Sequence, residues 1–398
     1  MVVLYDDYGF RQSVGGVSRY FAELVKHLPD SIESRLGIIR TRNLYLQDLP
    51  FSLPAQRVPR DLNWFCKKFL GGRYFRGLAR IYKLLMNCFP NLLRNDDRFN
   101  ELEFMRLARC DDVDVIHLTS AHQFDYNWQK AVGGRPFVVT VHDLIPELIQ
   151  GRAYVVQNRK KVLEAAAQVI AVSEFTKSKI IELYGIPQEK ITVIHHGFSM
   201  VLDDASNEAA PLVDGDYVLY VGDRHAYKNF SFFVTAMRRV MLKYPELRIV
   251  CTGDPFSYEE ETMFKVLGVV DRFMHFFASD RELAILYKFA RCFVYPSKME
   301  GFGLPILEAF SMGCPVLLSN CSCFPEIAKK AALYFNDEDT DCFVRQMKRI
   351  LSDEALCATL RSEGRTRLHD FSWRKCALET AAVYERAKKM DTRKLSEG

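Results

Sequence analysis

Residues 292–310 read CFVYPSKMEGFGLPILEAF, in which a short apolar run leads through a glycine-containing turn into a second apolar run. The first run, 292–295, has the length and composition of a buried strand. Gly301 and Gly303 allow a tight turn that a side chain would hinder. Pro305 suits the first turn of a helix, where its missing N–H group leaves no hydrogen bond unmade. The stretch therefore predicts a strand, a turn and a helix, the repeating unit of α/β proteins.

Two carboxylates flank this turn, Glu300 before it and Glu308 in the expected first turn of the helix. The start of a helix carries unpaired backbone N–H groups and the positive end of the helix dipole, and both favour a bound phosphate. Carboxylates beside it can accept hydrogen bonds from hydroxyl groups. A ligand with phosphate and hydroxyl groups is one interpretation, and a capped helix with solvated glutamates is the other. The stretch by itself leaves both open.

Strand and helix patterns alternate along the rest of the chain as well. A polar segment, DDASNEAAPLVDGD at 203–216, separates two such series and is predicted to be a linker. The expected strands are 2–5, 113–118, 137–141, 169–172 and 191–194 before it, and 217–221, 247–251, 273–276, 292–295 and 315–318 after it. Expected helices include 17–28, 230–243, 279–290, and 173–184, which Ser173 can cap.

This alternation predicts an α/β protein with two Rossmann-like, doubly wound domains that face each other across a cleft. The first domain is expected at 1–202 and the second at 217–370. A last helix at about 373–389, within the final segment 371–398, comes too late in the chain to belong to the second sheet.

Composition narrows the class of protein. A length of 398 residues fits two domains, and the formal net charge of +4 does not indicate nucleic-acid binding. Eleven cysteines without a CxxC motif or zinc-site spacing predict reduced, mostly buried thiols. The chain starts with a strand-like VVLYDD segment, and no apolar run reaches the roughly 18 residues that a membrane span needs. These features predict a soluble, cytoplasmic protein.

One segment, 57–94, departs from the α/β pattern. It contains nine basic residues and the single acid Asp61, with bulky aromatic and aliphatic residues such as Trp64, Phe65 and Phe69 between the charges. A helix-prone insertion that touches an anionic membrane surface is one interpretation. A solvated helix pair packed on the first domain is the other.

Residues with potential chemistry end or follow several expected strands. Arg224 and Lys228 lie in YVGDRHAYKN (220–229), after the first strand of the second domain, where two cations could neutralise a diphosphate. Ordinary surface charge is the alternative for this pair. His142 ends a strand of the first domain, and Gly15 and Gly16 precede a helix.

Six motifs together carry a resemblance to a known family. They are GGVSRY (15–20), VHDLIP (141–146), VSEFTKSKI (172–180), VIHHG (193–197), YVGDRHAYKN (220–229) and PSKMEGFGLPILEA (296–309). In this order, and over nearly the whole chain, they resemble the retaining GT-B glycosyltransferases of family 4. The E-x7-E spacing of Glu300 and Glu308 is the most specific of these features. The resemblance implies a GT-B fold whose final helix crosses back onto the first domain.

The resemblance also implies roles for residues around the turn. Glu308 would hold the ribose hydroxyls of a nucleotide-sugar donor, and Glu300 would hold the transferred sugar. The backbone of the turn would complete the sugar site, with Gly301, Phe302, Gly303 and Leu304 as the residues concerned.

Further roles fall on residues in both domains. Arg224 and Lys228 would bind the pyrophosphate, although many relatives have an arginine directly after the loop glycine, where this chain has Asp223. His142 would approach the transferred sugar. The catalytic candidates are therefore His142, Glu300, Arg224 and Lys228. The remaining donor-binding candidates are Gly15 and Gly16, facing the donor phosphates, and Phe277, near the nucleobase by its position after a strand.

Transfer with retention at the anomeric carbon follows from the resemblance. No carboxylate pair suggests a nucleophile and an acid for a double displacement, so the leaving phosphate is expected to take the proton of the acceptor. Fixed cations and a helix start can stabilise a leaving diphosphate, so no metal and no other cofactor is expected. Asp112-Val113-Asp114 resembles a metal-binding DxD motif, but we interpret it as the start of a strand.

The expected donor is a nucleoside diphosphate sugar, with GDP-mannose as the first choice and UDP- or dTDP-sugars next, because many similar proteins are mannosyltransferases. The expected acceptor is a saccharide or a lipid-linked saccharide in surface glycan synthesis. No residue pattern identifies the base.

Three other classes of protein share part of this pattern. A nicotinamide-dependent oxidoreductase needs a G-x-G-x-x-G turn after a strand, and GFGLPI has only the first two glycines. A GT-B phosphorylase or epimerase shares the architecture, but the E-x7-E spacing and the motif order weigh against it. A non-catalytic sugar-nucleotide-binding subunit stays open from the sequence.

Overall fold

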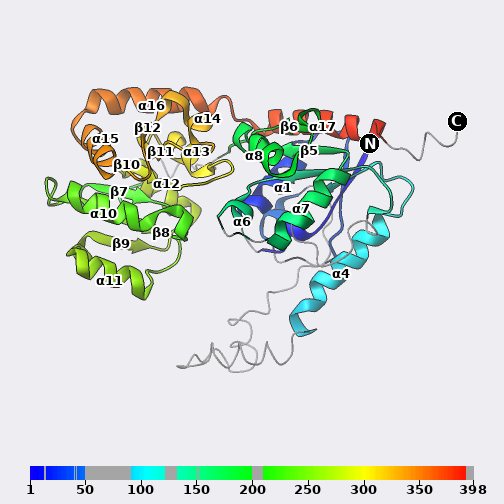
Figure 1. The fold of residues 1–398 in the computed structure, drawn as a ribbon, viewed down its shortest axis with the longest axis horizontal. Helices are drawn as coiled ribbons and strands as arrows, with labels where there is room; N and C mark the ends of the chain where they lie inside the picture. Colours follow the sequence, from blue (N-terminus) through cyan, green and yellow to red (C-terminus); the bar gives the residue numbers. More distant parts are fainter. Residues whose placement is uncertain are drawn as a thin grey trace.

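The computed structural model describes residues 1–12, 15–39, 41, 43–49, 91–121, 132–149, 151, 153–199 and 209–390. In these residues the chain forms two six-stranded parallel sheets, each covered by helices on both faces (Figure 1). The predicted α/β class and doubly wound architecture are confirmed. Parallel strands buried on both faces explain why most of them read as continuous apolar runs.

The first sheet has the strand order β2-β1-β3-β4-β5-β6. Its strands are β1 (Val2–Tyr5), β2 (Glu33–Leu36), β3 (Val115–Leu118), β4 (Phe137–Val141), β5 (Gln168–Ala171) and β6 (Ile191–Val193). The helical segments between them are η1 (Tyr8–Phe10), α1 (Gly16–His27), η2 (Tyr45–Asp48), α4 (Asn91–Leu107), α6 (Ile145–Leu148), α7 (Ala153–Ala165), α8 (Glu174–Tyr184) and η3 (Gln188–Lys190). Val3 and Tyr5 pack towards α1, and Leu4 packs on the opposite face, as the two-residue period of a strand requires.

The second sheet has the strand order β12-β11-β10-β7-β8-β9. Its strands are β7 (Tyr217–Tyr220), β8 (Arg248–Thr252), β9 (Phe273–Phe276), β10 (Cys292–Tyr295), β11 (Val316–Ser319) and β12 (Leu333–Phe335). Its helical segments are η4 (Ala226–Lys228), α10 (Phe230–Met241), α11 (Tyr258–Leu267), η5 (Val270–Arg272), α12 (Asp280–Phe289), α13 (Leu304–Ser311), α14 (Phe324–Ala328), η6 (Lys329–Ala331), α15 (Thr340–Ser352) and α16 (Glu354–Leu368).

Each sheet has one point where the strand order reverses direction. In the first sheet β1 lies between β2 and β3, and in the second β7 lies between β8 and β10. At such a point the loops that follow two neighbouring strands run to opposite faces of the sheet. This leaves a crevice between the loops at the carboxyl ends of the two strands. The fold therefore offers two places for a ligand, after β1 and β3 and after β7 and β10.

The last helix, α17 (Trp373–Lys389), returns to the first sheet and packs against α1, β4 and β5 (Figure 1). Its Tyr384 hydroxyl lies 2.9 Å from the Tyr5 hydroxyl and 2.6 Å from Nδ1 of His117, all of them buried. These groups satisfy one another where water is excluded. The helix is thus part of the core of the first domain.

Local signals placed most helices correctly. Ser173 caps α8, since its side chain accepts a hydrogen bond from the N–H group of Thr176, as predicted. Ser257 and Ser279 form capping boxes with Glu260 and Glu282 at α11 and α12. The structure adds two edge strands that the sequence did not indicate: β2, which is partly polar, and β12, which has three residues.

Two predicted segments lie largely outside the described residues. The basic segment 57–94 is one, apart from the backbone at 91–94, where α4 begins. Of the predicted linker, only 209–216 is described, and it forms neither helix nor strand. Within the described part of the chain, no helix combines the length and the apolar character needed to cross a membrane.

Candidate active site

Lys228 and Glu300 meet where the second sheet reverses its strand order. Lys228 follows β7 and Glu300 follows β10, and Nζ of Lys228 lies 2.7 Å from Oε1 of Glu300. Both side chains are largely buried, with exposed fractions of 14% and 12%. Nζ also donates to the Tyr295 hydroxyl at 3.3 Å. The structure therefore brings two of the four catalytic candidates into one ion pair.

The turn after Glu300 forms the start of α13. Gly303 has a φ of +93° at the N-cap of this helix, a conformation that costs other residues energy. Leu304 begins the helix, followed by Pro305, as expected. Phe302 is buried and stacks on His196, with ring centroids 4.5 Å apart. The helix therefore starts four residues after Glu300 along the chain.

The sequence had suggested that Glu308 lies in the first turn of the helix. Because α13 starts at Leu304, Glu308 lies in its second turn. Its Oε2 accepts a hydrogen bond from the Tyr287 hydroxyl at 3.2 Å. Its Oε1 lies 4.0 Å from Nη1 of Arg19, which α1 of the first domain supplies. Burial raises the pKa of Glu308, and Arg19 opposes this rise.

Arg224 makes its contacts inside the second domain in this structure. Its Nε donates to Glu260 at 2.8 Å, and its Nη atoms donate to the backbone oxygens of Thr252, Asp254 and Pro255. The side chain is only 5% exposed and packs its guanidinium over Phe230 and Phe256. These donors bind Glu260 and the β8–α11 connection, and the role of Arg224 at the pyrophosphate stays a prediction.

His142 directly follows β4, at the surface where the domains touch. Its ring packs edge-on against Tyr20 and Phe21, and its Nε2 is buried without a hydrogen-bond partner among the described residues. Burial, followed by the charge of Arg159, lowers the pKa of His142 to about 3. The ring is therefore neutral near pH 7 and cannot supply positive charge. It can still donate a hydrogen bond to a sugar hydroxyl or accept one from it.

A cavity of about 400 Å³ lies beside His142, at the reversal point of the first sheet. Its walls come from the segments after β1, β3 and β4 and from the start of α1; Tyr8, Gly16, Thr119, Ser120, His142 and Asp143 are among its residues. A Cβ atom on Gly16 would meet nothing within 4 Å, so this helix start faces open space. Gly15 is the N-cap of α1 in an extended conformation. The cavity has room for a sugar ring.

The remaining candidates lie apart from these groups. Phe277 follows β9, the edge strand two positions from β7, and its side chain is 85% exposed. Its role as a base neighbour stays a prediction. Asp112 pairs with Arg35 at 2.7 Å, and Asp114 accepts a bond from the N–H group of Val2 and pairs with Lys388. These two carboxylates lie before β3, at the opposite edge of the sheet from the cavity.

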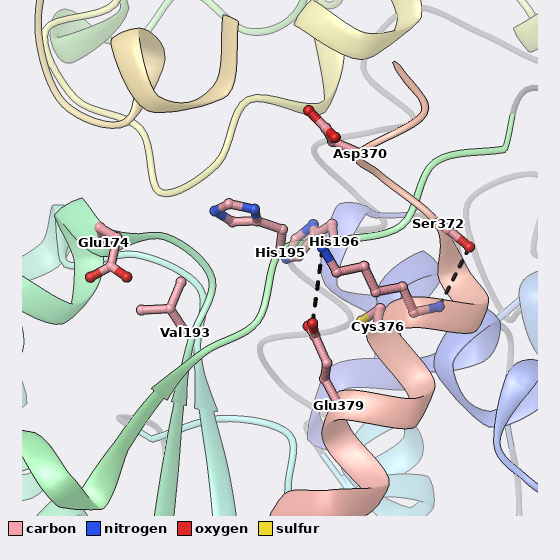
Figure 2. A pocket seen from close by; sticks show the side chains of 9 residues that line it. Glu174, Val193, His195, His196, Asp370, Ser372, Cys376 and Glu379 are labelled. Carbon is pink, nitrogen blue, oxygen red and sulfur yellow. Dashed lines mark hydrogen bonds and ion pairs between the residues drawn. The ribbon is translucent and has the colours of Figure 1, made fainter. Parts of the chain in front are cut away.

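A second cavity, of about 220 Å³, lies where the chain crosses between the domains. Figure 2 shows His195 and His196 on the segment after β6, with Ser372, Cys376 and Glu379 at the start of α17. Beside it, Glu326 of α14 accepts bonds from Nε2 of His195 at 2.6 Å and from the N–H group of Glu174 at 2.9 Å. The carboxylate thereby links the second domain to the start of α8, and we call this region, where the chain crosses between the domains, the crossover region.

Two residues near the site escaped sequence reasoning. Arg19 belongs to the quoted GGVSRY motif, but only the tertiary fold shows that it reaches Glu308. Tyr295 was placed in a buried strand, and its hydroxyl contacts Lys228. No group of three or more metal-ligating side chains occurs among the residues that the structure describes.

Comparison with known proteins agrees with this geometry. A family model described as glycosyl transferases group 1 matches residues 203–367, and one described as glycosyltransferase family 4 matches residues 14–200. O-antigen chain mannosyltransferase B of Escherichia coli is 28% identical over 58% of this chain and 64% of its own length. O-antigen chain mannosyltransferase RfbU of Salmonella typhimurium is 30% identical over 53% of this chain and 60% of its own length. The chain thus spans less than two thirds of the length of these relatives.

Solved structures share the fold over nearly the whole chain. HepE of Anabaena, in complex with UDP-glucose, matches with a TM-score of 0.68 and 17% identity, covering 97% of this chain and 99% of that one. Sucrose-phosphate synthase of Thermosynechococcus elongatus matches with a TM-score of 0.65 and 20% identity, covering 97% and 98%. With two parallel sheets, the site at their reversal points and both family models in order, this chain belongs to the GT-B glycosyltransferases of the family 4, group 1 type.

Proposed function

We propose that this protein transfers a sugar from a nucleoside diphosphate sugar to a saccharide acceptor, with retention at the anomeric carbon. The observation that carries the proposal is the Lys228–Glu300 pair at the β7/β10 reversal point, next to the start of α13. This arrangement combines a cation, a carboxylate and the start of a helix at the place where α/β sheets bind ligands.

Each group has a task in this proposal. Glu308 accepts hydrogen bonds from the donor ribose, and Glu300 and the Gly301–Leu304 backbone hold the sugar. Lys228 stabilises the negative charge that grows on the leaving diphosphate. Neutral His142 shares a hydrogen bond with a sugar hydroxyl. Removing one preorganised donor of such charge costs on the order of 3 kcal/mol of transition-state stabilisation, or about two to three decades in rate.

The bond changes balance without a covalent enzyme intermediate. The bond between the anomeric carbon and the diphosphate oxygen breaks, and the acceptor oxygen bonds to the same face of that carbon. The acceptor proton passes to the leaving phosphate. Glu300 is engaged by Lys228, which supports a sugar-binding role for it and not that of a nucleophile. The anomeric configuration of the product, read by NMR, tests retention.

We also propose that no metal ion is required, because Lys228 and the start of α13 supply positive potential where the diphosphate would lie. Activity should survive a chelator. A rate that collapses with EDTA and returns with Mn²⁺ would reject this part of the proposal.

GDP-mannose is the first choice of donor, and the similarity to two O-antigen chain mannosyltransferases supports mannose as the sugar. UDP and dTDP sugars are the next candidates. A thermal-shift screen over the three nucleotides and their sugars identifies the donor, because a ligand that binds only the folded state raises the melting temperature. Release of free nucleoside diphosphate on addition of acceptor then separates a transferase from a non-catalytic binding subunit.

The acceptor is proposed to be a saccharide that enters the cavity of about 400 Å³ in the first domain. If the saccharide is lipid-linked, the basic segment 57–94 would hold the protein at an anionic membrane face, at about 1 kcal/mol per engaged cation. Flotation with anionic vesicles tests this, with Lys67, Lys68, Arg73 and Arg76 neutralised in a variant. Equal partitioning of both proteins would leave a soluble acceptor as the better choice.

A further inference from the structure

Arg19 joins the first domain to the donor-site carboxylate of the second. It lies one turn into α1, and its Nη1 is 4.0 Å from Oε1 of Glu308. Its Nη2 donates to the backbone oxygen of Ser199 at 2.6 Å. The two branches of one guanidinium thus hold two segments at once, which a planar fork can do and a lysine ammonium on a flexible stem does less well.

The other groups around Glu308 do not supply positive charge. Tyr287 of α12 donates a hydrogen bond to Oε2, and Asp280 of the same helix adds a negative charge nearby. Tyr45 of η2 interacts with both Arg19 and Glu308. Burial favours the protonated acid; among these described neighbours the charge of Arg19 does most to favour the carboxylate, and the hydrogen bond from Tyr287 adds to it.

We propose that Arg19 is a positioning residue for donor recognition, which acts through Glu308. It holds the Glu308 side chain as an oriented carboxylate that can accept hydrogen bonds from both ribose hydroxyls, and it makes this state depend on contact between the domains. The inference rests on the proposed function, since Glu308 must bind the donor for Arg19 to matter. It also means that the positive charge beside Glu308 comes from the first domain, whereas Lys228 of the second domain lies beside Glu300.

A binding titration over pH tests this role. Calorimetry with GDP, UDP and dTDP between pH 5 and 8 compares wild type with Arg19→Gln, Arg19→Lys and Lys26→Gln. Lys26 is the matched control: it lies on the same helix and pairs with Glu23 at 3.3 Å, away from Glu308. The phosphate titration of the ligand itself is common to all variants and cancels in the comparison.

Affinity should fall at low pH as Glu308 becomes protonated, and we call this fall the acid limb. The Arg19→Gln variant should bind the preferred diphosphate about five- to tenfold more weakly near pH 6. Its acid limb should lie roughly one pH unit higher, because the carboxylate has lost a neighbouring positive charge. Arg19→Lys should keep the acid limb near its wild-type position, because the charge remains. Lys26→Gln should match wild type. In a Glu308→Gln background, Arg19→Gln should cause no further shift of the limb, since the titrating group is gone.

The outcomes separate the two levels of the proposal. A wild type that binds none of the three diphosphates removes the proposed function, and this inference with it. A wild type that binds, with Arg19→Gln equal to it in affinity and pH profile, overturns the role of Arg19 alone. A uniform loss of affinity at all pH values, with an unmoved acid limb, would make Arg19 a structural residue and also overturn the inference. Melting temperatures of all variants show that they are folded.

Discussion

The backbone oxygen of His142 occupies the place where a side chain of residue 301 would begin. An ideal Cβ atom built on Gly301 would lie 1.7 Å from that oxygen. Ser173 adds to the same contact by donating a hydrogen bond to the Gly301 oxygen at 2.7 Å. The two domains therefore touch through backbone atoms beside the Lys228–Glu300 pair, and Gly301 serves this contact as well as the turn.

Gly301→Ala should disturb domain contact more than it disturbs either domain. The added Cβ atom meets backbone, which cannot rotate away, so the domains must separate; overpacking of this kind costs about 1–3 kcal/mol. We expect an increased radius of gyration by X-ray scattering and a strongly reduced transfer rate, with secondary structure unchanged by circular dichroism. An unchanged scattering profile together with wild-type activity would contradict the contact.

A double-mutant cycle on Lys228 and Glu300 should show that the pair affects the free energy of unfolding and the diphosphate affinity differently. Lys228→Met or Glu300→Gln alone leaves a buried partner without its counter-charge, which should lower the free energy of unfolding by about 2–4 kcal/mol. The double variant should recover most of this loss in urea titrations. Diphosphate affinity should fall in every variant that lacks Lys228 and should persist in Glu300→Gln. A double variant with wild-type affinity would show that Lys228 is not a donor ligand.

Glu326 should make the stability of the crossover region sensitive to pH. Burial by itself would raise its pKa, but the bonds from His195 and from the N–H groups of Glu174 and Phe175 outweigh burial, and its pKa lies below its usual value. A carboxylate with a depressed pKa adds stability above its unfolded pKa and loses it as the pH falls through the folded one. Glu326→Gln should therefore melt below wild type at pH 7, and the gap should close towards pH 4.

Glu379→Gln is the control for that experiment. Its carboxylate lines the cavity of about 220 Å³ in the crossover region and pairs with Lys375 at 4.0 Å, with both side chains well exposed. Exposed pairs contribute about 0–1 kcal/mol, so this variant should melt close to wild type. A pH-independent gap for Glu326→Gln would contradict the electrostatic explanation.

Tyr384→Phe should weaken the docking of α17. The change removes the hydroxyl that lies between Tyr5 and His117 and leaves both without this partner in the core. Burial lowers the pKa of His117 to about 3, so its ring is neutral near pH 7. The neutral ring cannot form an ion pair in place of the lost hydrogen bond. We expect a loss of about 1–3 kcal/mol of unfolding free energy, measured in urea. Leu378→Ala, at a half-exposed position of the same helix, should change it much less.

Local patterns predicted the elements well. The strand at 292–295, the turn with Gly303 and the helix beginning near Pro305 are found as expected, because strand length, glycine conformation and helix starts depend on neighbouring residues. The helix 373–389 agrees residue for residue. The edge strands β2 and β12 were not predicted, because short strands with partly exposed side chains lack a continuous apolar run.

The sequence by itself determined the α/β class, the spacing of Glu300 and Glu308 and the family, since periodicity and motif order lie along the chain. Only the tertiary structure decided which charges meet. Lys228 and Arg224 are four residues apart, yet Lys228 reaches Glu300 from the neighbouring strand β10, while Arg224 binds Glu260 and the backbone after β8. Arg19 reaches Glu308 from the other domain. Strand order and domain contact set these pairs, and both come from packing between distant segments, which no local pattern encodes.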